Sequence, residues 1–349
     1  MTENGKPKFA MYWAASCGGC EISTLNIGDK ILDVDANFDI VFWPVAADFK
    51  YDDVRAYPDG YIDLCLFNGA IRNSENEEIA RLLRRKSKVL VAFGACASLG
   101  GIPAIANLTT TSALFNTVFL ESLSTHNPDG IIPQPHSQVP EGELHIPDFY
   151  DAVKSLEQVV EIDYTIPGCP PEAHQISAVI DAVIEVFHNK ATLPPRGSIL
   201  GASKVAVCEE CELEKNEKLI QRFYRPYEIT PQPGICLLEQ GLVCMGPATR
   251  GGCGALCPKV GMGCRGCYGA LDGVEDQGAR FLAAMASVTN VGTLKDSEQL
   301  AAQNIRAVMD TLADPAGTFY RFSLSHSLLN RARQTNGTGK GKANETHQH

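Results

Sequence analysis

Twelve of the thirteen cysteines fall into three groups of four. Thiolates are soft ligands, and sites built from four of them are the usual way in which proteins hold iron–sulfur clusters. Three groups therefore match three cubane clusters, which together would form a path for electrons. The first group is spread over the first half of the chain, and the other two crowd into its second half: Cys17, Cys20, Cys96 and Cys169; Cys208, Cys211, Cys236 and Cys244; Cys253, Cys257, Cys264 and Cys267.

Cysteines also serve other purposes. The Cys17-Gly-Gly-Cys20 motif alone is compatible with a thioredoxin-like dithiol, and the Cys-x-x-Cys pairs of the second half would equally suit zinc. The start of the chain has no charged segment followed by an apolar one, and no apolar run approaches the ~20 residues of a membrane span. We therefore expect a cytoplasmic protein, in which disulfides are rare and a cysteine pattern of this kind indicates metal binding.

The composition of the chain limits the number of domains and the class of binding partner. With 349 residues, of which 44% are hydrophobic, the chain can bury a sizeable core, and its length favours two domains. The net charge of −11 argues against nucleic acid or an anionic membrane surface as a partner, because both require a basic face.

Short apolar runs alternate with helical patterns along the first half. This alternation predicts a doubly wound α/β domain with a parallel sheet. The predicted strands are 8–14, 38–43, 61–67, 88–93 and a short one at 161–166, and the predicted helices are 20–32, 75–86 with a Ser74–Glu77 capping box, and 171–187.

The first four cysteines follow predicted strands. Cys17 and Cys20 come after the first strand, Cys96 after the fourth and Cys169 after the short strand. In open α/β sheets, ligands bind beyond the carboxyl ends of the strands. Three separate segments should thus bring four thiolates to one edge, where neighbouring glycines such as Gly94 permit close backbone approach to a bulky cluster.

The character of the sequence changes after a linker at 193–201. We predict a domain over 1–192 that carries the first group and a small irregular domain over 193–275, organised by metal, that carries the other two. Residues 101–160 lack periodic runs and predict an irregular excursion. A helical extension is expected over 276–330, with helical patterns at 279–286 and 299–312, and a disordered tail over 331–349.

Four motifs together resemble the small, electron-transferring subunit of nickel–iron hydrogenases. The similarity covers about Lys8 to Asp272. Two more specific features, Cys208-Glu-Glu-Cys211 and the segment 239–250, resemble the cytosolic, methyl-viologen-reducing branch that does not use coenzyme F-420. The four motifs are Ser16-Cys-Gly-Gly-Cys20-Glu, Gly94-Ala-Cys96-Ala-Ser-Leu-Gly100, Pro167-Gly-Cys169-Pro-Pro171 and Gly266-Cys267-Tyr-Gly269.

The resemblance implies a flavodoxin-like sheet and an order for the clusters. Cys17, Cys20, Cys96 and Cys169 would hold a proximal 4Fe-4S cluster, the four cysteines from Cys253 to Cys267 the medial one, and the four from Cys208 to Cys244 the distal one. Uptake enzymes of this family typically carry His in place of Cys208 and Pro in place of Cys257. The extra thiolate at Cys257 favours a 4Fe-4S medial cluster and a lower potential.

The resemblance also implies what the chain lacks. Hydrogen would be split at a nickel–iron centre in a separate large subunit, so this chain has no catalytic residue and alone should be inactive. Further partners implied by the branch are an additional iron–sulfur subunit and a heterodisulfide reductase. Two alternatives stay open: a complex I-like redox subunit with one cluster, and a zinc-stabilised binding module.

Two further residues invite a functional interpretation. Cys65 lies inside a predicted strand, and we expect an inert core thiol. Glu21 follows Cys20 and could face a partner or a proton path. We favour a charge in the first turn of a helix, where the helix dipole stabilises it.

Overall fold

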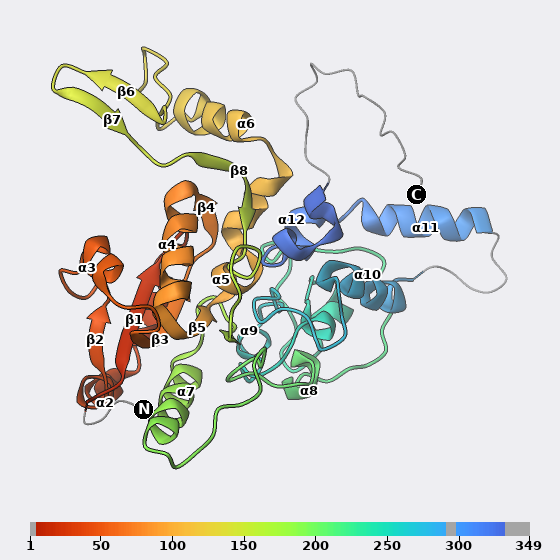
Figure 1. The fold of residues 1–349 in the computed structure, drawn as a ribbon. Coiled ribbons are helices and arrows are strands. Elements are labelled where there is room, and N and C mark those ends of the chain that lie inside the picture. Colours follow the sequence, from red (N-terminus) through yellow and green to blue (C-terminus); the bar gives the residue numbers. More distant parts are fainter. Residues whose placement is uncertain (1–4, 291–297, 332–349) are drawn as a thin grey trace, which may run out of the picture.

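The computed structural model describes residues 5–290 and 298–331. A central sheet of five parallel strands organises the first half (Figure 1). Its strand order, β2-β1-β3-β5-β9, is that of flavodoxin-like folds and confirms the predicted doubly wound sheet. The strands are β1 (Lys8–Trp13), β2 (Asp39–Phe42), β3 (Ile62–Asn68), β5 (Ser87–Phe93) and β9 (Tyr164–Ile166).

Helices cover both faces of this sheet. Successive side chains of a strand point to opposite faces, so Met11 packs in a cluster with Ile176 on one side and Tyr12 packs with Ile79 on the other. The first layer contains α1 (Gly19–Leu25), α2 (Ile31–Asn37) and α7 (Ala173–Phe187), and the second contains α3 (Tyr51–Ala56), α4 (Ser74–Lys86) and α5 (Ala95–Leu99).

The first helix is shorter than predicted. We expected one helix over 20–32, but α1 ends at Leu25, and a 3₁₀ turn, η1 (Gly28–Lys30), separates it from α2. Gly28 has a φ of +65°, in the left-handed region that a continuous α-helix cannot contain. The glycine therefore divides the apolar pattern between two helices.

The start of α4 also differs from the prediction. The helix cap is Asn73, whose side chain accepts a hydrogen bond from the Asn76 amide at 2.8 Å. Ser74 instead accepts one from the Asp148 amide at 3.0 Å. The predicted capping box is thus wrong, because a distant segment occupies the serine hydroxyl.

The excursion over 101–160 is more regular than predicted. It contains an antiparallel hairpin of β6 and β7, while β8 pairs with the short strand β4 (Ile71–Asn73). The hairpin is exposed on both faces, so its sequence shows no apolar alternation that would have revealed it. The elements are η2 (Ile102–Leu108), α6 (Thr111–Phe115), the π-helical turn η3 (Asn116–Glu121), β6 (His136–Val139), β7 (Gly142–His145) and β8 (Phe149–Lys154).

The cysteine-rich segment is built from short helices and loops. The predicted helix at 279–286 is present as α10 (Gln277–Val288), and its Phe281 and Met285 are buried against this segment. The short elements are α8 (Val207–Glu210), η4 (Leu238–Gln240), η5 (Gly246–Ala248) and α9 (Leu256–Lys259).

The chain then returns to the sheet. The pattern at 299–312 forms α11 (Glu298–Met309), and the Ser325 hydroxyl donates to the Leu99 carbonyl oxygen at 2.6 Å. The remaining elements are α12 (Pro315–Phe319), η6 (Leu324–His326) and η7 (Leu328–Arg331). Residues 332–349 of the predicted tail lie outside the described part. Within the described residues, no helix combines the length and apolar character that a membrane crossing requires.

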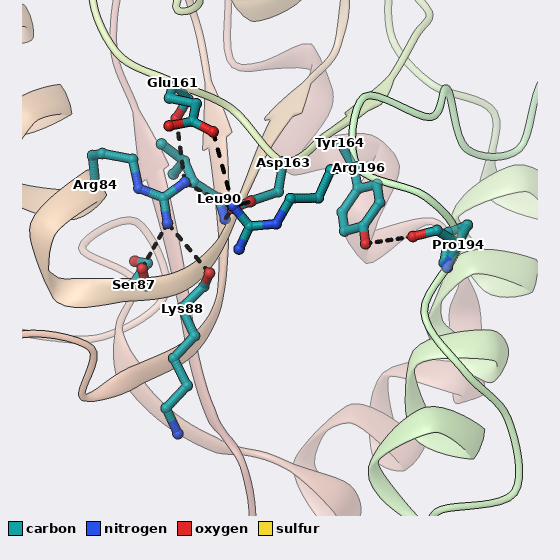
Figure 2. Close-up of polar contacts among 9 residues, drawn as sticks. All are labelled: Arg84, Ser87, Lys88, Leu90, Glu161, Asp163, Tyr164, Pro194 and Arg196. Atoms are coloured by element: carbon teal, nitrogen blue, oxygen red, sulfur yellow. Dashed lines mark hydrogen bonds and ion pairs between the residues drawn. The ribbon is translucent and has the colours of Figure 1, made fainter.

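A buried carboxylate, Asp163, anchors the edge strand β9 (Figure 2). Its Oδ2 accepts hydrogen bonds from Arg84 Nη1 at 2.7 Å and from the Leu90 amide at 2.8 Å, and its Oδ1 lies 3.0 Å from Arg196 Nη1. The side chain is only 1% exposed. One charge therefore joins α4, β5, β9 and the linker that leads to the cysteine-rich segment.

We predict that Asp163→Ala lowers the free energy of unfolding by about 3 kcal/mol, because the change removes one partner of a buried charge network. The measurement is chemical denaturation of the anaerobic protein. Asp59→Ala is the control, since Asp59 pairs with Lys86 at 3.0 Å but its side chain is 72% exposed. Equal unfolding curves for the two variants would contradict the anchoring role.

Candidate functional site

The first group of cysteines gathers at one edge of the sheet. Cys17 follows β1, Cys20 lies in α1, Cys96 lies in α5 and Cys169 follows β9. Because β1, β5 and β9 are parallel, their carboxyl ends meet at the same edge, next to the point where the winding of the chain reverses. Cys20 and Cys96 are buried, whereas Cys17 and Cys169 are exposed.

The pKa values of Cys20 and Cys96 respond to the other thiols of this group. Burial raises the pKa of Cys20, and the thiols of Cys96, Cys169 and Cys17 raise it further. Burial raises the pKa of Cys96 to about 12, again with contributions from Cys169 and Cys17. Four clustered thiols can all lose their protons only where a positive group compensates the charge.

Glycines leave room beside these thiols. A Cβ on Gly94 would lie 2.5 Å from Cys20 Sγ, and a Cβ on Gly101 would lie 2.7 Å from Cys96 Sγ. Both glycines also have positive φ angles, +84° and +58°. The backbone thus approaches the sulfur atoms more closely than any side chain would permit.

The group from Cys253 to Cys267 lies beside the first one. The pKa of Cys267 is raised to about 12, mainly by burial and to a smaller extent by the thiols of Cys169, Cys253 and Cys257. Burial and then Cys253 raise the pKa of Cys257. Burial also raises the pKa of Cys264, and the thiols of Cys244 and Cys267 contribute.

The group from Cys208 to Cys244 lines a cavity. Burial raises the pKa of Cys208 to about 12, and Cys244, Cys236 and Cys211 add to the shift while Lys215 opposes it. Cys208, Cys236 and Cys244 border a cavity of about 690 Å³. The cavity provides space next to the sulfur atoms for a bulky ligand.

The three groups form a row. The thiol of Cys169 in the first group contributes to the raised pKa of Cys267 in the second. The thiol of Cys244 in the third group contributes to the raised pKa of Cys264 in the second. The Cys264 amide donates a hydrogen bond to Cys244 Sγ at 3.3 Å. All thirteen cysteines lie in the described part of the chain, and none forms a disulfide. Sulfur-only donor sets of this kind fit soft metal groups, iron–sulfur clusters above all.

Sequence relatives decide the family. A family model described as NADH ubiquinone oxidoreductase, 20 Kd subunit, matches residues 17–183. Over 334 residues the chain is 40% identical to the F420-non-reducing hydrogenase iron-sulfur subunit of Archaeoglobus profundus, and the match covers 93% of this chain and 98% of that protein. The chain belongs to the family of F420-non-reducing hydrogenase iron-sulfur subunits.

A second relative and a solved structure also match most of the chain. The corresponding F420-non-reducing hydrogenase subunit from Methanothermobacter marburgensis is 36% identical over 329 residues, 93% of this chain and 96% of that protein. Among solved structures, a NiFeSe hydrogenase from Dm. baculatum matches over 76% of this chain and 95% of its own, with 19% identity and a TM-score of 0.49. The sequence relatives confirm the branch that the motifs predicted.

A buried glutamine braces this hydrogenase subunit between the first and second groups. Gln175 Nε2 donates to the carbonyl oxygens of Pro167 and Leu200, both at 3.3 Å, and the Tyr268 hydroxyl donates to Gln175 Oε1 at 2.8 Å. Pro167 precedes Cys169, and Tyr268 follows Cys267. Sequence reasoning missed this residue, because a glutamine inside an apolar helix gives no sign of its distant partners.

A second missed residue holds the third group to the second. The Glu210 carboxylate accepts hydrogen bonds from the amides of Gly252 at 2.6 Å and Gly254 at 2.9 Å, on either side of Cys253. The signal was available in the sequence, since Glu210 stands inside the Cys208–Cys211 motif. Its carboxylate positions the two cysteine loops relative to each other.

The two other residues singled out from sequence are both buried. Cys65 is fully buried in β3, and burial raises its pKa to about 12, so the expected core thiol is confirmed. Glu21 lies in the first turn of α1, as expected, and its side chain is buried. Its side chain accepts a hydrogen bond from Trp43 Nε1 at 2.7 Å, and burial raises its pKa against the opposing effects of Trp43 and Asn68.

We predict that Gly94→Ala disrupts the first group, because the new methyl group must displace Cys20 Sγ from a distance of 2.5 Å. Iron per chain, measured after anaerobic purification, should fall by about a third if the groups hold equal amounts. Gly273→Ala is the matched control, since Gly273 has a φ of +74° but nothing within 4 Å of the added atom. Equal iron in both variants would contradict the prediction, because the close approach to Cys20 Sγ would then have no effect of its own.

Proposed function

We propose that this subunit conducts electrons from hydrogen oxidation in a nickel–iron large subunit through three 4Fe-4S clusters. The proposal is supported by one observation. The three groups of four thiols lie one after another, from the sheet edge into the cysteine-rich segment. The proximal ligands would be Cys17, Cys20, Cys96 and Cys169, the medial ligands Cys253, Cys257, Cys264 and Cys267, and the distal ligands Cys208, Cys211, Cys236 and Cys244.

The cofactors would supply the electron chemistry and the chain would supply the environment. Bound iron–sulfur clusters accept and release single electrons. The chain's thiolates would hold the iron and its buried loops would exclude water, and its amides donate to sulfur, as those of Gly246 and Cys264 do at Cys244. Such hydrogen bonds tune a cluster's potential. No residue of this chain is assigned a catalytic role in splitting hydrogen.

The surface around the first group suits a large partner. Trp13, Ile22 and Leu25 expose 40%, 59% and 53% of their surface beside the exposed Cys17. The excursion over 101–160 adds further exposed apolar side chains, including Leu123 and Ile131. Exposed apolar side chains are typical of interaction sites when they gather, and obligate interfaces are large and apolar. We assign both sets of side chains to the interface with the nickel–iron subunit.

The downstream end of the row is the third group. We propose that it delivers electrons to an additional iron–sulfur subunit and from there to a heterodisulfide reductase, in the cytoplasm. The support is the resemblance of the Cys208–Cys211 motif and of segment 239–250 to this branch.

We predict that the anaerobic complex of this chain with its large subunit contains about twelve irons and twelve sulfides in this chain and reduces viologen dyes with hydrogen. The isolated chain should be inactive, because it has no group that activates hydrogen. Metal and acid-labile sulfide assays with hydrogen-dependent dye reduction are the measurements. Dye reduction by the chain alone, iron for one cluster only, or zinc in place of iron would overturn the proposal.

A further prediction concerns Cys257. If its thiolate is the fourth medial ligand, Cys257→Pro should convert that cluster toward a 3Fe-4S form and raise its potential, because an iron corner and a negative ligand are lost. Turnover with a low-potential acceptor should then fall more than turnover with a high-potential dye. Low-temperature electron paramagnetic resonance of the oxidised complex detects the new cluster.

Two variants serve as controls for this prediction. Cys257→Ser keeps the shape of the side chain and separates loss of the thiolate from the effect of proline. Cys65→Ala removes a cysteine that lies outside the three groups and should leave the spectrum unchanged. An unaltered spectrum and turnover in Cys257→Pro would mean that Cys257 is not a ligand.

A further inference from the structure

A second kind of ligand set lies on the hairpin of β6 and β7, which falls between Cys96 and Cys169 in the sequence. His136 pairs directly with His145, and Gln138 pairs with Glu143. Residues opposite each other in an antiparallel pair share a face, as do residues two apart on one strand. The hairpin register therefore brings His136, Glu143 and His145 to the same face.

The side chains of these three residues converge. Glu143 Oε1 lies 3.8 Å from His136 Nδ1, and Glu143 Oε2 lies 3.6 Å from His145 Nε2. One ligand atom from each residue lies within 4.8 Å of the others. Tetrahedral zinc sites with bonds of about 2.0–2.2 Å place their ligand atoms roughly 3.3–3.6 Å apart. Small side-chain rotations would thus complete the geometry around one ion.

The surrounding charge favours a cation. The sequence contains no lysine or arginine between Lys88 and Lys154, so the part of the excursion from 101 to 153, which carries the hairpin, lacks fixed positive charge. Near the hairpin it carries Glu141, Glu143 and Asp148. An acidic segment without basic residues attracts a divalent ion to its imidazole and carboxylate groups.

The donor set selects the kind of ion. Two imidazoles with one carboxylate suit zinc and related transition metals, whereas calcium and magnesium prefer oxygen ligands alone. The three side chains are 56–69% exposed, which leaves a fourth position open to water or to a partner's side chain. Figure 1 shows the hairpin at the outer end of the excursion, away from the cysteine-rich segment.

We propose that His136, Glu143 and His145 form a binding site for a divalent transition-metal ion of the Zn²⁺ class. This site is separate from the cysteine groups and does not depend on the electron-transfer role. Bound metal cross-links β6 and β7 near their open end and holds the hairpin in one register. The site thereby stiffens a projecting part of the surface that we assign to the large subunit.

Zinc binding by the intact complex tests the site. The cluster-loaded complex is dialysed anaerobically against micromolar zinc chloride, and zinc and iron per chain are then measured. We expect about one zinc per chain in the wild type and background zinc in His136→Ala and His145→Ala. His126→Ala is the matched control, because His126 is an exposed histidine of the same excursion and should keep the zinc.

Iron content and amide hydrogen exchange distinguish zinc bound at the hairpin from zinc bound at the cysteines. Equal iron in all variants shows that zinc has not replaced iron at the cysteines. Zinc should also slow amide exchange over 136–145 in the wild type, and should not do so in Glu143→Gln, which keeps the shape of the hairpin. Equal zinc in wild type and His145→Ala, no zinc in the wild type, or zinc-independent exchange over 136–145 would each refute the site.

Discussion

The convergence of three parallel strands at one sheet edge is the constraint on which the molecule depends. β1, β5 and β9 end at the same edge of the sheet, with β3 between β1 and β5, and the turns and helices that follow them carry the thiols of the first group. Parallel pairing makes this convergence unavoidable once the strands form, because every strand must end at the same edge. The cysteine-rich segment has no comparable sheet and takes its position from contacts with that edge.

Buried and partly buried polar groups fix the position of the rest of the chain relative to this edge. Asp163 joins β9 to α4, β5 and the linker, and Gln175 joins the Cys169 turn to the linker and to Tyr268. Glu210 then connects the loops of the second and third groups. Each of these groups is costly to bury without partners, so each permits one arrangement of the segments that it joins. The row of thiol groups follows from these few contacts.

The local sequence pattern was sufficient to predict the strands of the central sheet but not those of the excursion. Strands buried on both faces leave continuous apolar runs, and the helices between them leave a 3.6-residue period, so both could be predicted. The hairpin of β6 and β7 is exposed and polar, and its strands leave no such signal. The left-handed turn at Gly28 and the cap at Asn73 depend on backbone geometry and on Asp148, which no local pattern contains.

The amino-acid sequence by itself determined the three groups of cysteines, the sheet edge that receives the first group, and the branch of the family, because these follow from residue type, spacing and motif. Only the tertiary structure decided that Cys169 neighbours Cys267 and Cys244 neighbours Cys264, and hence that the groups form a row. It also decided that Glu21 is buried and that His136 meets His145. These contacts join residues far apart in the chain or across a turn, and their distances are set by packing, which spacing along the sequence does not encode.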